Sequence, residues 1–179
     1  FNTLFAVGEL FDFQTDVKII GLGYNSVSLI DEKTGIIDNP ASLSSLDYME
    51  FSFSQNFLQD NLSLSTIKFG LPIKSHTFGV RTSYFQLPDF KEIVFGESTG
   101  NILSFKEYLI TLTYSIDIKK ILSFGLNARY YNSTLGVETG KAIAFDTGII
   151  LPLRFPNLSN KNNKNLAIGV ACLLYTSDA

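Results

Sequence analysis

Polar and apolar residues alternate along most of the chain from Tyr48 onward. Because successive side chains of a strand point to opposite faces, this pattern predicts β-strands with one apolar and one polar face. The alternation is clearest in Phe105–Asp117, whose apolar positions are Tyr108, Ile110, Leu112, Tyr114 and Ile116. The predicted strands are Tyr48–Asn56, Ser63–Leu71, Thr77–Gln86, Phe105–Asp117, Leu122–Ser133, Lys141–Leu153 and a last one that begins at Leu166–Ala171.

These strands are long compared with the roughly 5–6 residues of a typical globular strand. Lys106 to Ile116 extends over roughly 33 Å at about 3.3 Å per residue. A tilt of about 40° reduces the rise to roughly 25 Å, the height of the apolar band on a membrane barrel. Tyr108 and Tyr114 then lie toward the two ends of the outward face, where interfacial aromatic residues are common. The sequence therefore predicts an all-β fold: an antiparallel up-and-down meander that forms part of a transmembrane β-barrel.

Most connections between the predicted strands are also typical of a membrane barrel. Pro72–Ser75 and Asp117–Lys120 are predicted short turns, whereas Leu87–Ser104 is a predicted long polar loop and Thr134–Gly140 a further connection on its side. Short periplasmic turns and longer outer loops are typical of bacterial barrels. Arg154–Asn165 departs from this pattern, and its Asn/Lys-rich composition indicates a solvated loop, with a periplasmic docking site as the alternative.

Composition and charge exclude several other classes of protein. The formal net charge of −3 and the pI near 5.1 argue against a nucleic-acid partner. No run approaches the roughly 18 consecutive apolar residues of a spanning helix, whereas alternating membrane strands leave no such run. The single histidine, His76, lies beside a predicted turn, and the sequence has no CxxC, HExxH or Ser/His/Asp arrangement. We therefore expect no enzymatic activity, no cofactor and no metal site.

The sequence at each end of the chain leads to a separate expectation. Phe1–Ala6 is either the tail of a signal peptide or the start of the mature chain. Residues 172–179, CLLYTSDA, resemble the translation of a sequencing adapter, so the native sequence is expected to end near Ala171. On that interpretation Cys172, the only cysteine, supports no inference about disulfides or redox compartment.

A motif precedes the strands, in GLGYNSVSLIDEKTGIIDNPASLSSL, residues Gly21–Leu46. It resembles the N-terminal signature of the FadL-type outer-membrane β-barrel superfamily, in particular its PorV/PorQ-like branch. The matching positions are Gly21, Gly23, Asp31, Asn39, Pro40, Ala41 and Leu43. Tyr24 and Asn25 replace a small residue or glycine, and Asp38 replaces an aromatic residue, which affects the choice of subfamily. The resemblance extends over about Gly21–Leu153.

This resemblance implies the N-terminal part of one outer-membrane barrel domain over residues 1–171, located in the bacterial outer membrane and surrounded by its lipid. It implies a hatch-like segment at about residues 31–46 and strands from residue 48 onward. Asn39 and Pro40 favour a turn, after which Ala41–Leu46 is expected to be short and helical or irregular. In the family such a segment lies inside the barrel; an ordinary turn between strands is the alternative.

Two functions follow from the resemblance. PorV-like members bind exported proteins and pass them to the machinery of surface attachment, and this role in export or surface assembly is the one we expect. FadL-like members instead conduct hydrophobic small molecules across the outer membrane. The alternative is a soluble β-sandwich binding module, in which the same alternation of polar and apolar residues occurs without a membrane.

Four charged residues are predicted to point into the lumen: Arg81, Glu107, Arg129 and Asp146. An arginine on the lipid side of a barrel at mid-membrane costs about 2–4 kcal/mol, which argues for an inward Arg129. The simplest interpretation of Glu107, Arg129 and Asp146 is an ion pair that satisfies buried charge. The alternative is a polar contact for a substrate or for the hatch.

Overall fold

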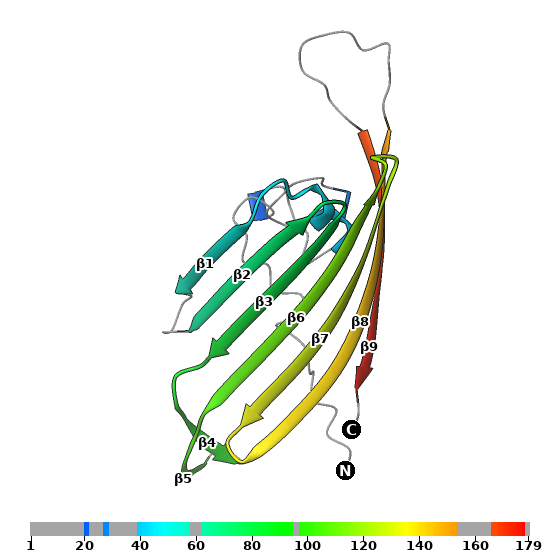
Figure 1. Cartoon of the computed structure of the whole chain (residues 1–179). Coiled ribbons are helices and arrows are strands. Elements are labelled where there is room, and N and C mark those ends of the chain that lie inside the picture. Colours follow the sequence, from blue (N-terminus) through cyan, green and yellow to red (C-terminus); the bar gives the residue numbers. More distant parts are fainter. Residues whose placement is uncertain are drawn as a thin grey trace.

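The computed structural model describes residues 20–21, 27–28, 39–57, 62–94, 97–153 and 166–177. Figure 1 shows a sheet of long strands with a short 3₁₀ helix, η1, at one end. The elements are η1 (Pro40–Ser45), β1 (Glu50–Phe57), β2 (Ser63–Ile73), β3 (His76–Gln86), β4 (Phe90–Val94), β5 (Glu97–Leu103), β6 (Phe105–Ile118), β7 (Leu122–Leu135), β8 (Glu138–Leu153) and β9 (Leu166–Ser177).

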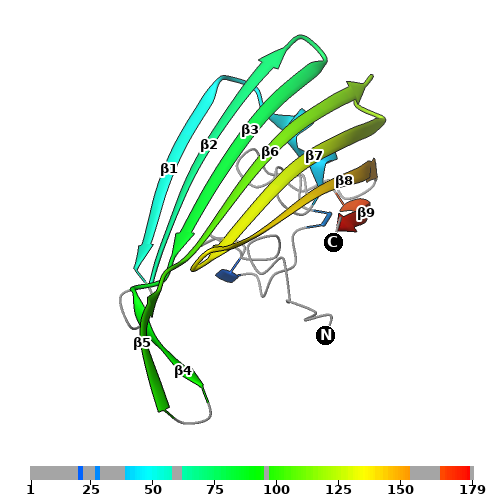
Figure 2. The same ribbon diagram turned by 90° about the horizontal axis from the view of Figure 1, so that it is seen from below.

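The main sheet has seven strands in the order β1-β2-β3-β6-β7-β8-β9, and every neighbouring pair is antiparallel. Strands that follow one another in the chain are therefore neighbours in the sheet, apart from the β4–β5 hairpin inserted between β3 and β6. Seen from below, the sheet is curved (Figure 2). The prediction of an all-β, antiparallel meander is confirmed.

The strands begin and end close to the predicted bounds, and the central ones are longer than predicted. β6 and β7 have 14 residues each and β8 has 16. β9 continues through Cys172, and its backbone pairs with β8 as far as Ser177. The structure describes the predicted hatch-like segment from Asn39 onward. Residues 31–38, which include Asp31, lie outside the described residues, and so do Gly23 and Phe1–Ala6.

The loop predicted at Leu87–Ser104 is wrong, and the connection predicted at Thr134–Gly140 is shorter than its predicted bounds. Leu87–Ser104 contains the β4–β5 hairpin, a two-stranded sheet in which Phe90 pairs with Leu103. Its charged residues suggested a loop, but its β-branched and aromatic residues favour strands. Thr134–Gly140 contains only a tight turn at residues 136–137, because β7 and β8 pair as far as Leu135 and Glu138. Gly136 has a φ of 59°, which glycine adopts without strain.

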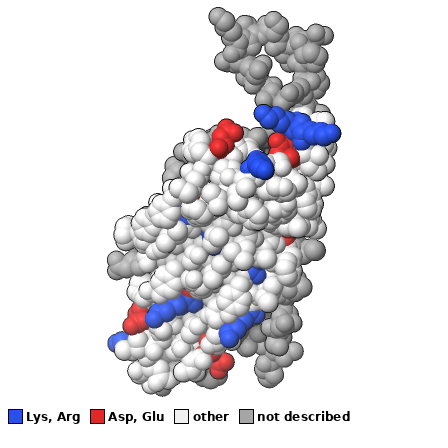
Figure 3. All heavy atoms as spheres, viewed as in Figure 1, with Lys and Arg blue, Asp and Glu red and all other residues white. Residues whose placement is uncertain are grey.

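The two faces of the sheet differ sharply in exposure. η1 packs against β6, β7 and β8, and we call the face that carries it the concave face. Along β6, the concave side chains from Glu107 to Ser115 are buried, whereas Tyr108 and Leu112 on the convex face are exposed. In the view onto the convex face, charged side chains gather toward the two ends and leave a mostly uncharged band between them (Figure 3).

Candidate functional site

The concave face buries many polar and charged side chains beside a small apolar cluster. Those at most 4% exposed on its strands are Thr66, Thr77, Arg81, Ser83, Glu107, Thr111, Thr113, Ser115, Asn127, Arg129 and Asp146. Burying such groups is unfavourable unless each one finds a hydrogen bond or an opposite charge. The hydrogen-bond and ion-pair partners of these side chains therefore define the candidate functional site.

The segment Asn39–Leu46 begins with a capped turn. The Asn39 side chain accepts a hydrogen bond from Ala41 N at 3.0 Å, and Pro40 occupies the first helical position, where its missing N–H is harmless. Three serine hydroxyls then donate to the carbonyl three residues before them, at 2.7–2.8 Å: Ser42 to Asn39, Ser44 to Ala41 and Ser45 to Ser42. The segment thus satisfies much of its own backbone without needing a partner strand.

Three strand glycines make room for this segment. A Cβ atom at Gly125 in β7 would lie 2.2 Å from the Pro40 carbonyl carbon and 2.3 Å from Ala41 N. A Cβ at Gly148 in β8 would lie 2.0 Å from Asn39 Oδ1, and one at Gly70 in β2 would lie 2.7 Å from Leu46 Cδ2. At Gly125 the backbone of the segment therefore rests directly on the backbone of the sheet, and at Gly148 and Gly70 side chains of the segment lie against it.

Hydrogen bonds hold the segment in this seat. Asn39 Nδ2 donates to the Val27 carbonyl at 2.8 Å and to the Ile149 carbonyl of β8 at 3.3 Å. From β6, Ser115 Oγ donates to the Ala41 carbonyl at 3.3 Å. Ala41, Leu43 and Leu46 are buried against the concave face. The described part of the segment, Asn39–Leu46, lies on the concave face.

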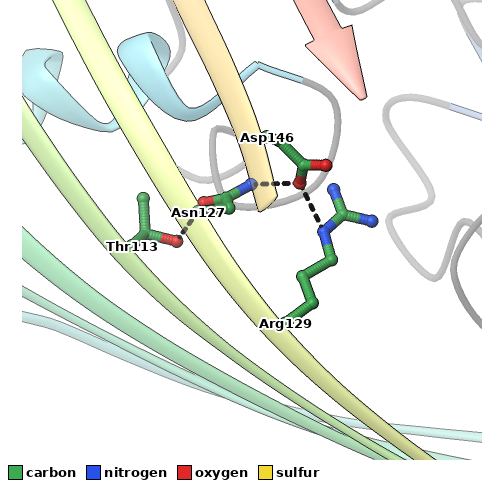
Figure 4. A network of polar contacts seen from close by, with 4 residues as sticks. All are labelled: Thr113, Asn127, Arg129 and Asp146. Carbon is green, nitrogen blue, oxygen red and sulfur yellow. Dashed lines mark hydrogen bonds and ion pairs between the residues drawn. The ribbon is translucent and has the colours of Figure 1, made fainter. Parts of the chain in front are cut away.

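A charged network crosses β6, β7 and β8 beside the segment (Figure 4). Thr113 Oγ1 donates to Asn127 Oδ1 at 2.7 Å, and Asn127 Nδ2 donates to Asp146 Oδ2 at 3.1 Å. Arg129 Nε lies 2.5 Å from the same Asp146 oxygen, with both side chains almost fully buried. We call these four residues the Asp146 network. Antiparallel register explains it, because Thr113, Asn127 and Asp146 are direct cross-strand partners.

Glu107 belongs to a different part of the concave face. The Tyr131 hydroxyl donates to Glu107 Oε1, and Tyr131 packs in a small apolar cluster with Leu64, Leu109 and Ala144. Register separates Glu107 from the Asp146 network, since Glu107 pairs with Ser133 whereas Arg129 pairs with Thr111, and the apolar cluster adjoins the network where Ala144 pairs with Arg129. Arg81 is opposite Thr111 on its other side, in the transverse row that contains Arg129.

All four charged residues predicted to face inward are therefore buried on the concave face, but they are not one cluster. Arg129 and Asp146 form the ion pair, Glu107 bonds to Tyr131, and Arg81 lies across Thr111 from Arg129. Sequence reasoning did not single out Asn127, Thr113 or Tyr131, which complete these contacts. The cross-strand register would have placed Asn127 opposite Asp146, but register is not visible in the alternation alone.

Two buried polar atoms of the concave face are free to bind a further polar group. Asp146 Oδ1 and Thr111 Oγ1 are buried without a hydrogen-bond partner, so one acceptor and one hydroxyl stay available to a polar group. Within the described part of the chain, no three His, Cys, Asp or Glu side chains are grouped to hold a metal ion. In the same ranges, no helix is both long and apolar enough to span a membrane.

Known proteins were compared with the chain in three ways. No protein-family model, no curated protein and no solved structure matches it.

Proposed function

We propose that this chain forms part of the wall of a bacterial outer-membrane β-barrel, in which Asn39–Leu46 is an inner plug and the convex face contacts lipid. One observation carries the proposal: the polarity of the sheet is opposite to that of a soluble protein. Phe51, Leu112 and Phe145 on the convex face are 67%, 55% and 54% exposed, while Arg81 and Asp146 on the concave face are 1% exposed. Soluble domains almost never bury arginine and aspartate while they expose a continuous apolar face.

The distribution of convex side chains supports a lipid contact. From Tyr108 to Tyr114 the outward residues of β6 are uncharged, and so are their neighbours in β3 and β7, which are apolar, tyrosine or threonine apart from Asn132 opposite Tyr108. Tyr84 is directly opposite Tyr108 at one end of this band, and at the other end Phe78 is opposite Tyr114, with their ring centroids 5.5 Å apart. Aromatic side chains at both borders of an apolar band are typical of membrane barrels.

Within this frame we propose the PorV-like role, a carrier that takes part in protein export or surface assembly. The plug is seated on backbone at Gly125 and Gly148 and is hydrogen-bonded to β6 and β8. The charges beside it are neutralised within the wall by the Arg129–Asp146 pair. A plug that is hydrogen-bonded to the sheet, with the charges beside it already paired, favours a protein that presents a surface to a partner over one that opens for small molecules.

Thiol accessibility tests the membrane contact. In a Cys172→Ser background, Leu112→Cys places a thiol in the middle of the convex face and Lys120→Cys places one at an exposed turn. After reconstitution into liposomes, we expect a charged, water-soluble maleimide to label Lys120→Cys and to leave Leu112→Cys unlabelled until detergent is added. Equal labelling of the two thiols in intact liposomes would refute the lipid contact.

A genetic comparison separates carrier from channel. Deletion of the gene from the bacterium that encodes it should reduce exported proteins on the cell surface and leave uptake of hydrophobic small molecules unchanged. The opposite pattern would favour the FadL-like channel. Pro40→Gly adds a second readout: it should loosen the plug and raise leakage of small solutes through liposomes, whereas leakage equal to wild type would argue against the plug.

A further inference from the structure

Two tight turns lie side by side at one end of the sheet. The β2–β3 turn contains Lys74 and Ser75, and the β6–β7 turn is formed by residues 119–121. Because β3 pairs with β6, the turns are neighbours, and Asp117 N donates to the Ser75 carbonyl at 2.8 Å. Lys74, Lys119 and Lys120 are exposed, as are the isoleucines next to them, Ile73, Ile118 and Ile121. We call these six residues the Ile–Lys rim.

All three lysines have a backbone conformation that lysine rarely adopts. Their φ angles are 59° at Lys74, 53° at Lys119 and 59° at Lys120. Hairpin turns with positive φ normally use Asn-Gly or Gly at these positions, because other side chains crowd the backbone there. Lysine brings no conformational advantage to such a turn. The property that lysine does supply, and that glycine and asparagine lack, is a positive charge on a long flexible side chain.

The charge of the rim is not cancelled within the two turns. They carry the three lysines, and one acidic residue, Asp117 at the end of β6, lies beside them; its Oδ1 accepts a hydrogen bond from Lys120 N at 2.9 Å. The isoleucines flanking the lysines are 49%, 44% and 67% exposed. Below them, His76 Nδ1 and Tyr114 Oη are 2.7 Å apart on the convex face. From the apolar band to its edge, the convex face therefore carries apolar side chains first, then aromatic groups, and then the lysines.

We infer that the Ile–Lys rim binds the phosphate headgroups of anionic phospholipids in the leaflet that it borders. This inference rests on the proposed membrane location. In that setting the isoleucines lie at the boundary of the acyl chains, and the lysine stems extend along them so that the ammonium groups reach the headgroup phosphates. Lysines near an anionic leaflet are attracted strongly enough to change local lipid composition.

A single tryptophan can report which lipid occupies the rim, because the chain has no tryptophan of its own. Ile121→Trp places the reporter beside Lys120, and Tyr108→Trp places a control reporter at the other border of the apolar band. Each protein is reconstituted into bilayers of phosphatidylcholine and phosphatidylglycerol, in which one or the other lipid carries bromine as a quencher. The ratio of quenching by the two brominated lipids gives the local preference for the anionic headgroup.

Charge removal that improves the turns then separates lipid binding from structure. In the Ile121→Trp background, Lys74→Gly, Lys119→Asn and Lys120→Gly install residues that suit positive φ, so the unfolding midpoint should stay or rise. The preference for phosphatidylglycerol should nevertheless fall by about fivefold for each lysine that contacts the lipid. The matched control removes three exposed lysines from the opposite end: Lys91→Gln, Lys106→Gln and Lys141→Gln. Arginine at the three rim positions should preserve the preference.

The outcomes are distinct. A preference reported by the Ile121→Trp protein that survives the triple rim variant, or that falls equally in the opposite-end control, overturns the rim inference. The inference is also overturned if free inorganic phosphate abolishes the preference while a chloride salt of the same ionic strength has no effect. The rim would then be a site for free phosphate. If neither reporter is quenched by either lipid, the chain does not contact the bilayer, and it is the proposed function that fails.

Discussion

A methyl group at Gly125 should disturb the plug by colliding with its backbone. In Gly125→Ala the new Cβ would lie 2.2 Å from the Pro40 carbonyl carbon, and all three nearest atoms belong to backbone, which cannot rotate away. To restore an ordinary contact of about 3.4 Å, the Pro40–Ala41 peptide must retreat by about 1.2 Å. Gly140→Ala, in β8, is the matched control, because no atom lies within 4 Å of its Cβ position.

The size of the effect follows from what holds the plug. Overpacking of a well-packed site costs about 1–3 kcal/mol. Expelling the segment would cost more, because Leu43 and Leu46 would each lose about 1.5–3 kcal/mol of burial and the bonds of Asn39 and Ser115 about 1 kcal/mol each. We therefore expect the plug to shift rather than leave, with a loss of about 1–3 kcal/mol. Gly140→Ala should change stability by less than about 1 kcal/mol, in the stabilising direction.

Urea unfolding in detergent micelles, followed by circular dichroism, measures both variants. A second readout reports on the plug itself: Ser42→Cys, in a Cys172→Ser background, places a thiol in the buried turn. Its labelling should be faster with Gly125→Ala than with Gly140→Ala. If both variants unfold at the same urea concentration and the thiol is equally protected in both, the contact between the segment and the β7 backbone at Gly125 is refuted.

Three other variants test separate parts of the structure. Asn39→Ala removes the turn cap and the bond to β8, and should cost about 1–2 kcal/mol in the same urea assay, with Ser44→Ala as a milder control. Asp146→Ala leaves the Arg129 charge buried without its partner and should cost about 3–5 kcal/mol, whereas the double change Arg129→Met, Asp146→Leu should recover much of that loss; no recovery contradicts the pairing. Leu112→Arg should cost about 2–4 kcal/mol in lipid bilayers, and a change within about 0.5 kcal/mol would indicate that the convex face meets water.

The alternation of residues was enough to predict the strands and their faces, because each strand has one buried and one exposed side. The same signal failed at Leu87–Ser104, where charged residues interrupt the apolar positions although the backbone still pairs. It also gave no reason to end β7 at Leu135 rather than two residues earlier, since the turn at Gly136 depends on a backbone conformation and not on periodicity.

The candidate site was predicted as a face and not as a set of contacts. Arg129 could be placed inward because a charge is costly in lipid, and Asp146 because of the alternation, but their contact with each other and with Asn127 depends on which residues are opposite each other across the strands. The seat of the plug was beyond the sequence for the same reason: Gly125 and Gly148 are 86 and 109 residues away from Asn39 along the chain. Only the folded sheet brings these positions together.

The β4–β5 hairpin has a consequence for how sequence change is distributed over this protein. It forms a sheet of its own, and at its base Leu87 N donates to the Phe105 carbonyl at 3.0 Å. Substitutions or insertions near its tip therefore alter neither the register of the long strands nor the glycines under the plug. Sequence change can therefore accumulate in the hairpin while the seven long strands stay constant. For the same reason, it is the position at which an affinity tag or a foreign epitope should be inserted.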